Sequence, residues 1–147
     1  MFKSFFYLLS LSTSALATPV VNMEKRVEHY GEAIEYNPGF GACGGLNGPG
    51  DFVVALNAAK FDEDHGGNCD QVVSITNSEN GRQAVATVVD RCFCGNDGLA
   101  LSPSLLLYLN NGNPKEDKLP IHWHFLPEKV ATSVSVSGPF PTRRHTS

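Results

Sequence analysis

The chain has 147 residues, a formal net charge of −4 and 41% hydrophobic side chains. This length is enough for one domain with its own core, but not for two. The acidic balance argues against nucleic acid and anionic membrane surfaces as partners.

The first residues have the pattern of an export signal. Lys3 precedes an apolar core at 5–9, and Ala15-Leu16-Ala17 forms a small-x-small cleavage site. That apolar run is too short to span a bilayer, and no later run is longer. We therefore expect a signal peptide over residues 1–17 and a secreted, extracellular product with no membrane anchor.

A dibasic pair, Lys25-Arg26, follows in a polar stretch without strand patterning. One interpretation is a propeptide over 18–26 that is cleaved after Arg26; the other is an ordinary charged linker. Cleavage would leave eight basic and fourteen acidic side chains, a formal charge of −6.

The first half of the ordered chain is predicted to be mostly extended. Residues 30–36 have strand character, and 37–51 form a long loop that contains six glycines. Residues 52–57 are apolar on both faces, which is typical of a strand buried on both sides. A turn or a single helical turn is expected over 58–62.

The second half contains a hairpin, one helix and a last strand. Alternating segments at 71–77 and 82–90 flank Asn80-Gly81, which indicates a β-hairpin. Ser102 is predicted to be the N-cap of a helix with Pro103 in its first position. A strand over 119–125 follows, and 127–147 are expected to form a disordered tail. Short strands, many turns and one helix favour a compact barrel.

Four cysteines in an exported chain of this size indicate two disulfides. A zinc site would need ligands clustered more tightly than Cys43, Cys69, Cys92 and Cys94. His122 and His124 alternate with Trp123 in a predicted strand, so the two imidazole rings lie on one face. No third metal ligand accompanies them in the sequence. The acidic run 62–65 lacks calcium-loop spacing. We expect no metal and no cofactor.

Several short motifs occur in a fixed order that resembles a known superfamily. They are Gly31-Glu32-Ala33, Gly41-Ala42-Cys43-Gly44, Asp51-Phe52-Val53-Val54-Ala55-Leu56, Cys69-Asp70-Gln71, Val88-Val89-Asp90-Arg91-Cys92, Leu101-Ser102-Pro103 and Trp123-His124-Phe125. In this order they resemble the small secreted fungal proteins of the RlpA-like, expansin-like and barwin-like double-psi β-barrel superfamily. The resemblance covers residues 30–126, within a domain expected over 27–126.

The resemblance implies a mainly β fold, a six-stranded double-psi β-barrel with one short appended helix and an open groove for an extended polymer. It also implies disulfides Cys43–Cys69 and Cys92–Cys94. Relatives usually have two residues between the latter cysteines, whereas only Phe93 separates them here.

Glycan hydrolysis needs two carboxyl groups at one bond. Asp90 matches the family's strand-end aspartate, which the resemblance implicates in catalysis, but the family's other acid is Ala100 here. Asp90 can equally be structural, accepting hydrogen bonds from loop N–H groups. Asp97 lies close to the missing acid in sequence, but in a turn. The prediction leans towards a protein that is not an enzyme.

Carbohydrate grooves present aromatic rings and a few polar groups. The candidate binding residues are Tyr30, Tyr36, Phe40, Asp51, Asp90 and Phe93. The first hypothesis is a non-hydrolytic, expansin- or loosenin-like monomer that binds cell-wall polysaccharide such as glucan, cellulose or chitin. The alternative is a protease inhibitor or an effector directed at a host protein. The third is a weak glycosidase or lytic transglycosylase that uses Asp90.

Overall fold

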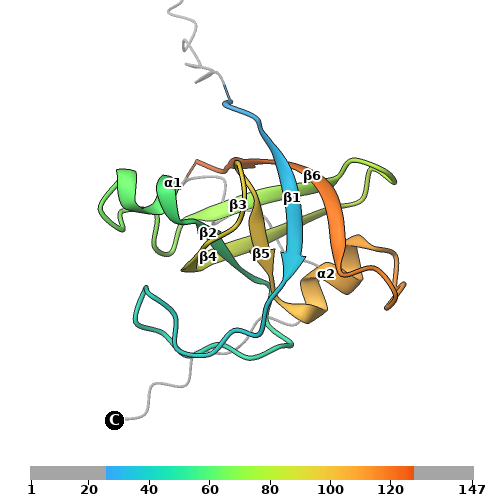
Figure 1. Ribbon diagram of the computed structural model, residues 1–147, viewed down its shortest axis with the longest axis horizontal. Helices are drawn as coiled ribbons and strands as arrows, with labels where there is room; N and C mark the ends of the chain where they lie inside the picture. The colour runs from blue at the N-terminus through green and yellow to red at the C-terminus, as the bar shows by residue number, and fades with distance from the viewer. Residues whose placement is uncertain (1–25, 128–147) are drawn as a thin grey trace, which may run out of the picture.

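The computed structural model describes residues 26–127. Six strands and two short helices follow one another in this part of the chain (Figure 1). In chain order they are β1 (His29–Glu35), β2 (Val53–Asn57), α1 (Ala58–Glu63), β3 (Val72–Asn77), β4 (Gln83–Cys92), β5 (Leu99–Leu101), α2 (Pro103–Leu109) and β6 (Lys118–Phe125). Neither helix is long and apolar enough to cross a membrane. The expected signal peptide, Lys25 and residues 128–147 of the tail lie outside the described residues.

The strands form a closed barrel in the order β1-β5-β2-β4-β3-β6. The first and last strands pair antiparallel, from His29 opposite Trp123 to Ile34 opposite Lys118. Two pairs, β1 with β5 and β2 with β4, run parallel. Parallel neighbours need long crossover connections, and here these are the loops and helices at the barrel ends. The mainly β, six-stranded barrel predicted from the sequence is confirmed.

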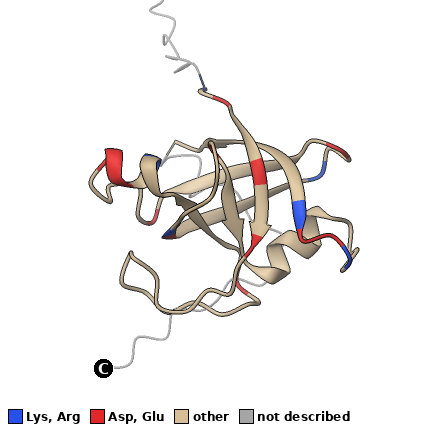
Figure 2. Ribbon diagram, in the orientation of Figure 1, with Lys and Arg blue, Asp and Glu red and all other residues tan. Residues whose placement is uncertain are grey.

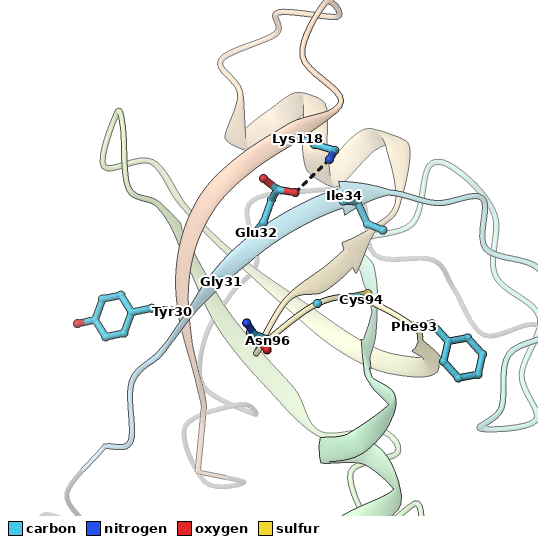
Figure 3. Close-up of a pocket in the computed structure, with 9 residues that line it drawn as sticks. Tyr30, Gly31, Glu32, Ile34, Phe93, Cys94, Asn96 and Lys118 are labelled. Atoms are coloured by element: carbon cyan, nitrogen blue, oxygen red, sulfur yellow. Dashed lines mark ion pairs between the residues drawn. The ribbon is translucent and has the colours of Figure 1, made fainter.

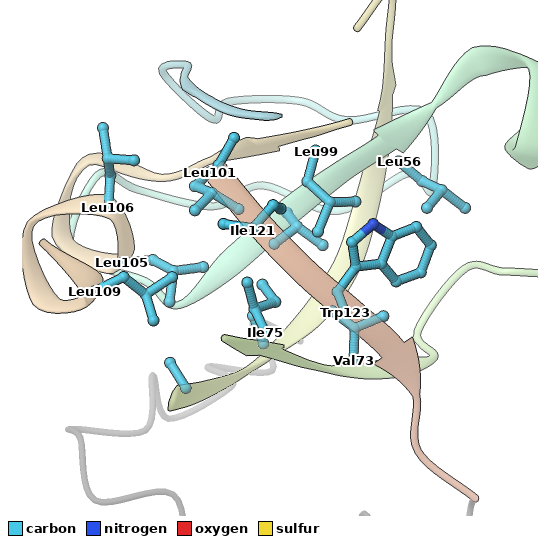
Figure 4. Close-up of a cluster of buried hydrophobic side chains, with 14 of the residues drawn as sticks. Leu56, Val73, Ile75, Leu99, Leu101, Leu105, Leu106, Leu109, Ile121 and Trp123 are labelled. Atoms are coloured by element: carbon cyan, nitrogen blue, oxygen red, sulfur yellow. The ribbon is translucent and has the colours of Figure 1, made fainter. Parts of the chain in front are cut away.

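Apolar side chains from all six strands and from α2 fill the barrel interior (Figure 4). Trp123 of β6 is completely buried among them, and its indole Nε1 donates a hydrogen bond of 2.7 Å to the Asp97 carbonyl. Trp123 is therefore a core residue of the barrel. Satisfying the indole N–H allows so large a side chain to be buried without an unpaired donor.

The two strands of the predicted hairpin pair antiparallel, and Gly81 at the turn has a positive φ of 74°. The expected single turn after β2 is the short helix α1. One strand was not predicted: β5 has only three residues, too few for a periodic pattern to be recognised.

The helix predicted at Ser102 is present, with Pro103 in its first turn. Ser102 is the N-cap residue, as predicted, although its side chain makes no cap hydrogen bond. Its hydroxyl instead donates to the Asp51 carbonyl. This contact ties the end of the glycine-rich loop to the start of α2.

Candidate functional site

Asp90 lies near the end of β4, where the glycine-rich loop crosses the strand. Its Oδ1 atom accepts hydrogen bonds from the backbone N–H groups of Ala42 at 2.9 Å and Arg91 at 2.8 Å. The neighbouring Gly41 permits this crossing, because a Cβ atom there would lie 2.3 Å from the Val89 carbonyl oxygen. Asp90 thus fastens the loop to the barrel, which is the structural role considered from the sequence.

Tyr36 follows β1 and carries a buried hydroxyl close to Asp90. Burial raises the pKa of this hydroxyl well above its usual value of 10.0, and the negative charge of Asp90 raises it further. The hydroxyl finds no hydrogen-bond partner among the described residues. The structure therefore brings Tyr36 and Asp90 together, with a protonated tyrosine beside the carboxylate.

A small apolar cluster covers the outer face of β2 and β5. Ala55, Cys94 and Ala100 are buried in it, and Ile34, Tyr36 and Cys92 pack against them. Ala100, which the sequence resemblance placed where relatives carry a second acid, is only 1% exposed. The methyl groups of Ala55 and Ala100 leave room for the tip of the chain at 92–94 to pack on the barrel wall, so no proton donor stands at this position.

Both disulfides that the resemblance implied are present. Cys43 is bonded to Cys69 with a Cα–Cα distance of 5.5 Å, and Cys92 to Cys94 with a Cα–Cα distance of 5.3 Å. The first joins the glycine-rich loop to the segment before β3. The second closes a short ring around Phe93.

An open groove of about 530 Å³ lies on the outer face of β1. Glu32 and Ile34 of this strand border the groove, the ring of Tyr30 points outward at one end of it, and residues Phe93 to Asn96 line the other side (Figure 3). Lys118 of β6 borders the groove and forms an ion pair of 3.3 Å with Glu32. The groove therefore combines aromatic, apolar and charged groups along an extended strand.

Glycine allows the wall of the groove to rest directly on β1. A Cβ atom at Gly31 would lie 2.6 Å from the Asp97 carbonyl oxygen, and one at Gly98 would lie 2.8 Å from the Glu32 carbonyl oxygen. Side chains at these two positions would push the turn at 95–98 away from the strand. Both glycines thus set the distance between the two sides of the groove.

Three large apolar side chains are exposed on the loops near Asp90. Phe40 and Leu46 face each other across a β-bridge in the glycine-rich loop and are 85% and 68% exposed. Phe93, at the disulfide-bonded tip, is 94% exposed. We call these three residues the apolar rim. Large apolar side chains that are exposed to this extent on ordered loops make these loops a candidate binding surface.

The other candidate residues lie elsewhere. The Asp51 carboxylate accepts a 2.8 Å hydrogen bond from the Gly48 N–H and so closes a turn of the loop. Tyr30 is 69% exposed at one end of the groove, with its ring beside His122. Asp97 has a positive φ of 48° and pairs with His29 at 3.4 Å, so it belongs to a turn and not to the surroundings of Asp90. Arg26, the second residue of the dibasic pair, is exposed.

The two histidines of β6 have separate contacts. His124 pairs with Glu28 at 2.9 Å, and His122 lies 3.2 Å from the Ser78 hydroxyl. Among residues 26–127 no group of three or more potential metal ligands occurs. Figure 2 shows acidic residues on α1 and on β1.

Sequence reasoning missed Glu32, Asn96 and Lys118 as groove residues. Alternation along β1 places Glu32 on the same face as Tyr30 and could have identified it. The other two reach the groove only through the register of β6 and the path of the turn after the tip, for which a single sequence carries no signal.

Comparisons with known proteins show similarity in structure. No protein-family model matches the chain, and no curated protein matches it either. A mutant expansin of Clavibacter michiganensis in complex with cellohexaose is similar with a TM-score of 0.59 and 19% identity, over 69% of this chain and 52% of that one. The apo form of the Clavibacter expansin gives a TM-score of 0.58 and 20% identity, over 69% and 52% of the two chains.

A Streptomyces papain inhibitor is similar with a TM-score of 0.56 and 25% identity, over 69% of this chain and 96% of the inhibitor. This chain thus spans about half the length of the expansin chains, but nearly all of the inhibitor. Taken with the closed six-stranded barrel, these similarities show that the chain has the double-psi β-barrel fold that expansins and this inhibitor share.

Proposed function

We propose that the protein binds an extended cell-wall polysaccharide along the outer face of β1 without cleaving it. The observation that carries this proposal is the open groove between β1 and the turn at 93–96. From Tyr30 to Ile34, the part of β1 that lines the groove, the strand provides about 13 Å of extended surface. A polymer chain needs such an elongated site, whereas a small ligand needs an enclosed pocket.

The groups in the groove suit a carbohydrate. Tyr30 offers an exposed ring for stacking on a sugar face, and its hydroxyl stays in water. Glu32, Lys118 and Asn96 provide donors and acceptors for sugar hydroxyls. A neighbour with the same fold is described as an expansin in complex with cellohexaose, which supports this class of ligand.

The arrangement of carboxylates favours binding over hydrolysis. Hydrolytic enzymes place two carboxyl groups about 5–9.5 Å apart around one bond. Here Asp90 holds the loop, and the second acid position is the buried Ala100. The carboxylate in the groove, Glu32, lies four residues before Tyr36, about 13 Å along the chain from the residue that neighbours Asp90. Glu32 is also paired with Lys118.

Retention on insoluble cellulose, chitin and β-glucan at low salt tests the proposal. We expect retention of the wild type, release of no reducing ends, and binding about tenfold weaker for Tyr30→Ala through loss of the stacking ring. Leu107→Ala is the matched control, because Leu107 is an exposed apolar residue of α2 that does not line the groove. A wild-type protein that none of the three polysaccharides retains would overturn the proposal.

A second candidate function is inhibition of a protease or binding of another extracellular protein. The exposed apolar rim on loops held by disulfides favours it, and so does the similarity to the Streptomyces papain inhibitor. Both candidates fit an extracellular protein, since structural disulfides persist in oxidising compartments.

A further inference from the structure

Phe93 is the most exposed large apolar side chain in the described part of the chain, at 94%. Its ring projects away from the β1 groove, on the side where the glycine-rich loop lies (Figure 3). A phenyl ring in water is unfavourable unless a partner covers it. Groups from β2 and α1 hold the tip that carries this ring.

The backbone of the tip is braced from β2. Cys92 pairs with Asn57 in the parallel ladder between β4 and β2. The Asn57 side chain donates a hydrogen bond to the Cys94 carbonyl and accepts one of 3.0 Å from the Ala59 N–H at the start of α1. One side chain thus links the tip to the helix, in addition to the Cys92–Cys94 disulfide.

The ring itself is contacted by a cation. The guanidinium carbon of Arg91 lies 5.5 Å from the centroid of the Phe93 ring, within cation–π range. The same guanidinium forms an ion pair of 2.8 Å with Asp62 of α1. The ion pair with Asp62 therefore holds the Arg91 guanidinium beside the Phe93 ring.

We propose that Phe93 is a preorganised anchor that inserts into an apolar pocket of a protein partner, and that Arg91, held by Asp62, is a positioning residue for it. This inference rests on the second candidate function, protein binding, and not on polysaccharide binding. An anchor that is already ordered loses less conformational freedom when it binds.

The charges around the anchor define the partner further. Asp90 lies three residues before Phe93, and α1 and the residue that follows it carry Asp62, Glu63 and Asp64 beside the tip. Arg91 is paired with Asp62, and Lys60 of α1 with Glu63, so the four carboxylates still leave a net negative charge around the anchor. The partner is therefore a protein whose phenyl-sized pocket is bordered by basic groups.

Inhibition of papain by the full domain tests the proposal, with inhibition constants and dissociation rates measured for each variant. We expect Phe93→Ala to raise the inhibition constant at least about tenfold, as for a buried interface anchor. Arg91→Gln and Asp62→Asn should raise it about threefold, mainly through faster dissociation. Arg91→Lys keeps the charge but loses the planar group and should fall between them and the wild type. Leu107→Ala should behave as the wild type.

The outcomes separate the inference from the function on which it rests. Failure of the wild type to inhibit papain would overturn both the inhibitor candidate and the anchoring role. Inhibition that Phe93→Ala leaves intact would overturn the anchor alone. Relaxation of the labelled Phe93 ring in the free protein provides a second readout: equal ring order in wild type and Arg91→Gln would overturn the positioning role of Arg91.

Discussion

At the residue scale, the most informative side chain is Asp90, whose carboxylate accepts hydrogen bonds from the backbone. One oxygen of Asp90 accepts hydrogen bonds from two backbone N–H groups. The nearby Tyr36 hydroxyl is buried and has no hydrogen-bond partner among residues 26–127. A catalytic acid or base must be free to exchange a proton with its substrate. The contacts of Asp90 therefore favour a role in holding the loop and shaping the site.

The buried tyrosine predicts a stability change at alkaline pH. The pKa of Tyr36 is raised in the folded protein by burial, and secondly by Asp90, so the folded state retains a proton that the unfolded chain releases near pH 10.0. Its contribution is fully present below that pH and is lost as the pH rises above it. We expect the free energy of unfolding to fall above pH 10 more steeply for the wild type than for Tyr36→Phe.

Urea denaturation at pH 7 and at several values from pH 9 to 11 measures this difference. At pH 7, Tyr36→Phe should be within about 1 kcal/mol of the wild type, because the hydroxyl it removes has no hydrogen-bond partner. Parallel curves for the two proteins across the alkaline range would contradict the assignment.

At the element scale, two disulfides act on loops of very different length. The bond from Cys43 to Cys69 spans 26 positions and fastens the glycine-rich loop, whereas that from Cys92 to Cys94 spans two. In the loop-entropy model a disulfide stabilises more when it closes a longer loop. In the long loop this covalent bond acts together with the hydrogen bonds of Asp90, Asp51 and Ser102.

Removal of each pair should therefore have unequal effects. Replacement of both Cys43 and Cys69 by alanine is expected to lower the free energy of unfolding by about 3.5 kcal/mol, and the same change at Cys92 and Cys94 by about 1 kcal/mol. Denaturant titrations of the two double variants under identical conditions give the comparison. Equal losses would show that the native contacts, and not the loop lengths, determine the effect.

At the scale of the whole molecule, the barrel is closed by the pairing of its first and last strands. β6 lies between β1 and β3, and its Trp123 is buried in the common core. Neither half of the chain can complete the barrel without the other. Folding should therefore be cooperative, as is usual for single domains of this size.

The single tryptophan reports on this cooperativity. We expect the urea transitions followed by Trp123 fluorescence and by far-UV circular dichroism to coincide. Trp123→Ala should lower the free energy of unfolding by about 3–5 kcal/mol, as for other large core residues. Two separated transitions would show that the β1–β6 closure opens independently of the rest of the barrel.

Local sequence determined the elements whose physical signal is local. The apolar run of β2 predicted a strand buried on both faces, and Asn80-Gly81 between two alternating segments predicted the hairpin, because Gly81 adopts a positive φ without strain. Pro103 predicted the start of α2. The ordered motifs added the barrel class and the disulfide pairing, which periodicity alone does not specify.

Only the tertiary structure decided what the site contains. β5 is held by β1 and β2 on either side and is too short to be recognised alone. The register of β6 against β1 brings Lys118 to Glu32, and the fold of α1 against β4 brings Asp62 to Arg91. Ser102 is the predicted N-cap of α2, but the contact of its hydroxyl with the Asp51 carbonyl depends on the fold. These contacts join residues far apart in the chain, and their geometry follows from barrel closure rather than from any local preference.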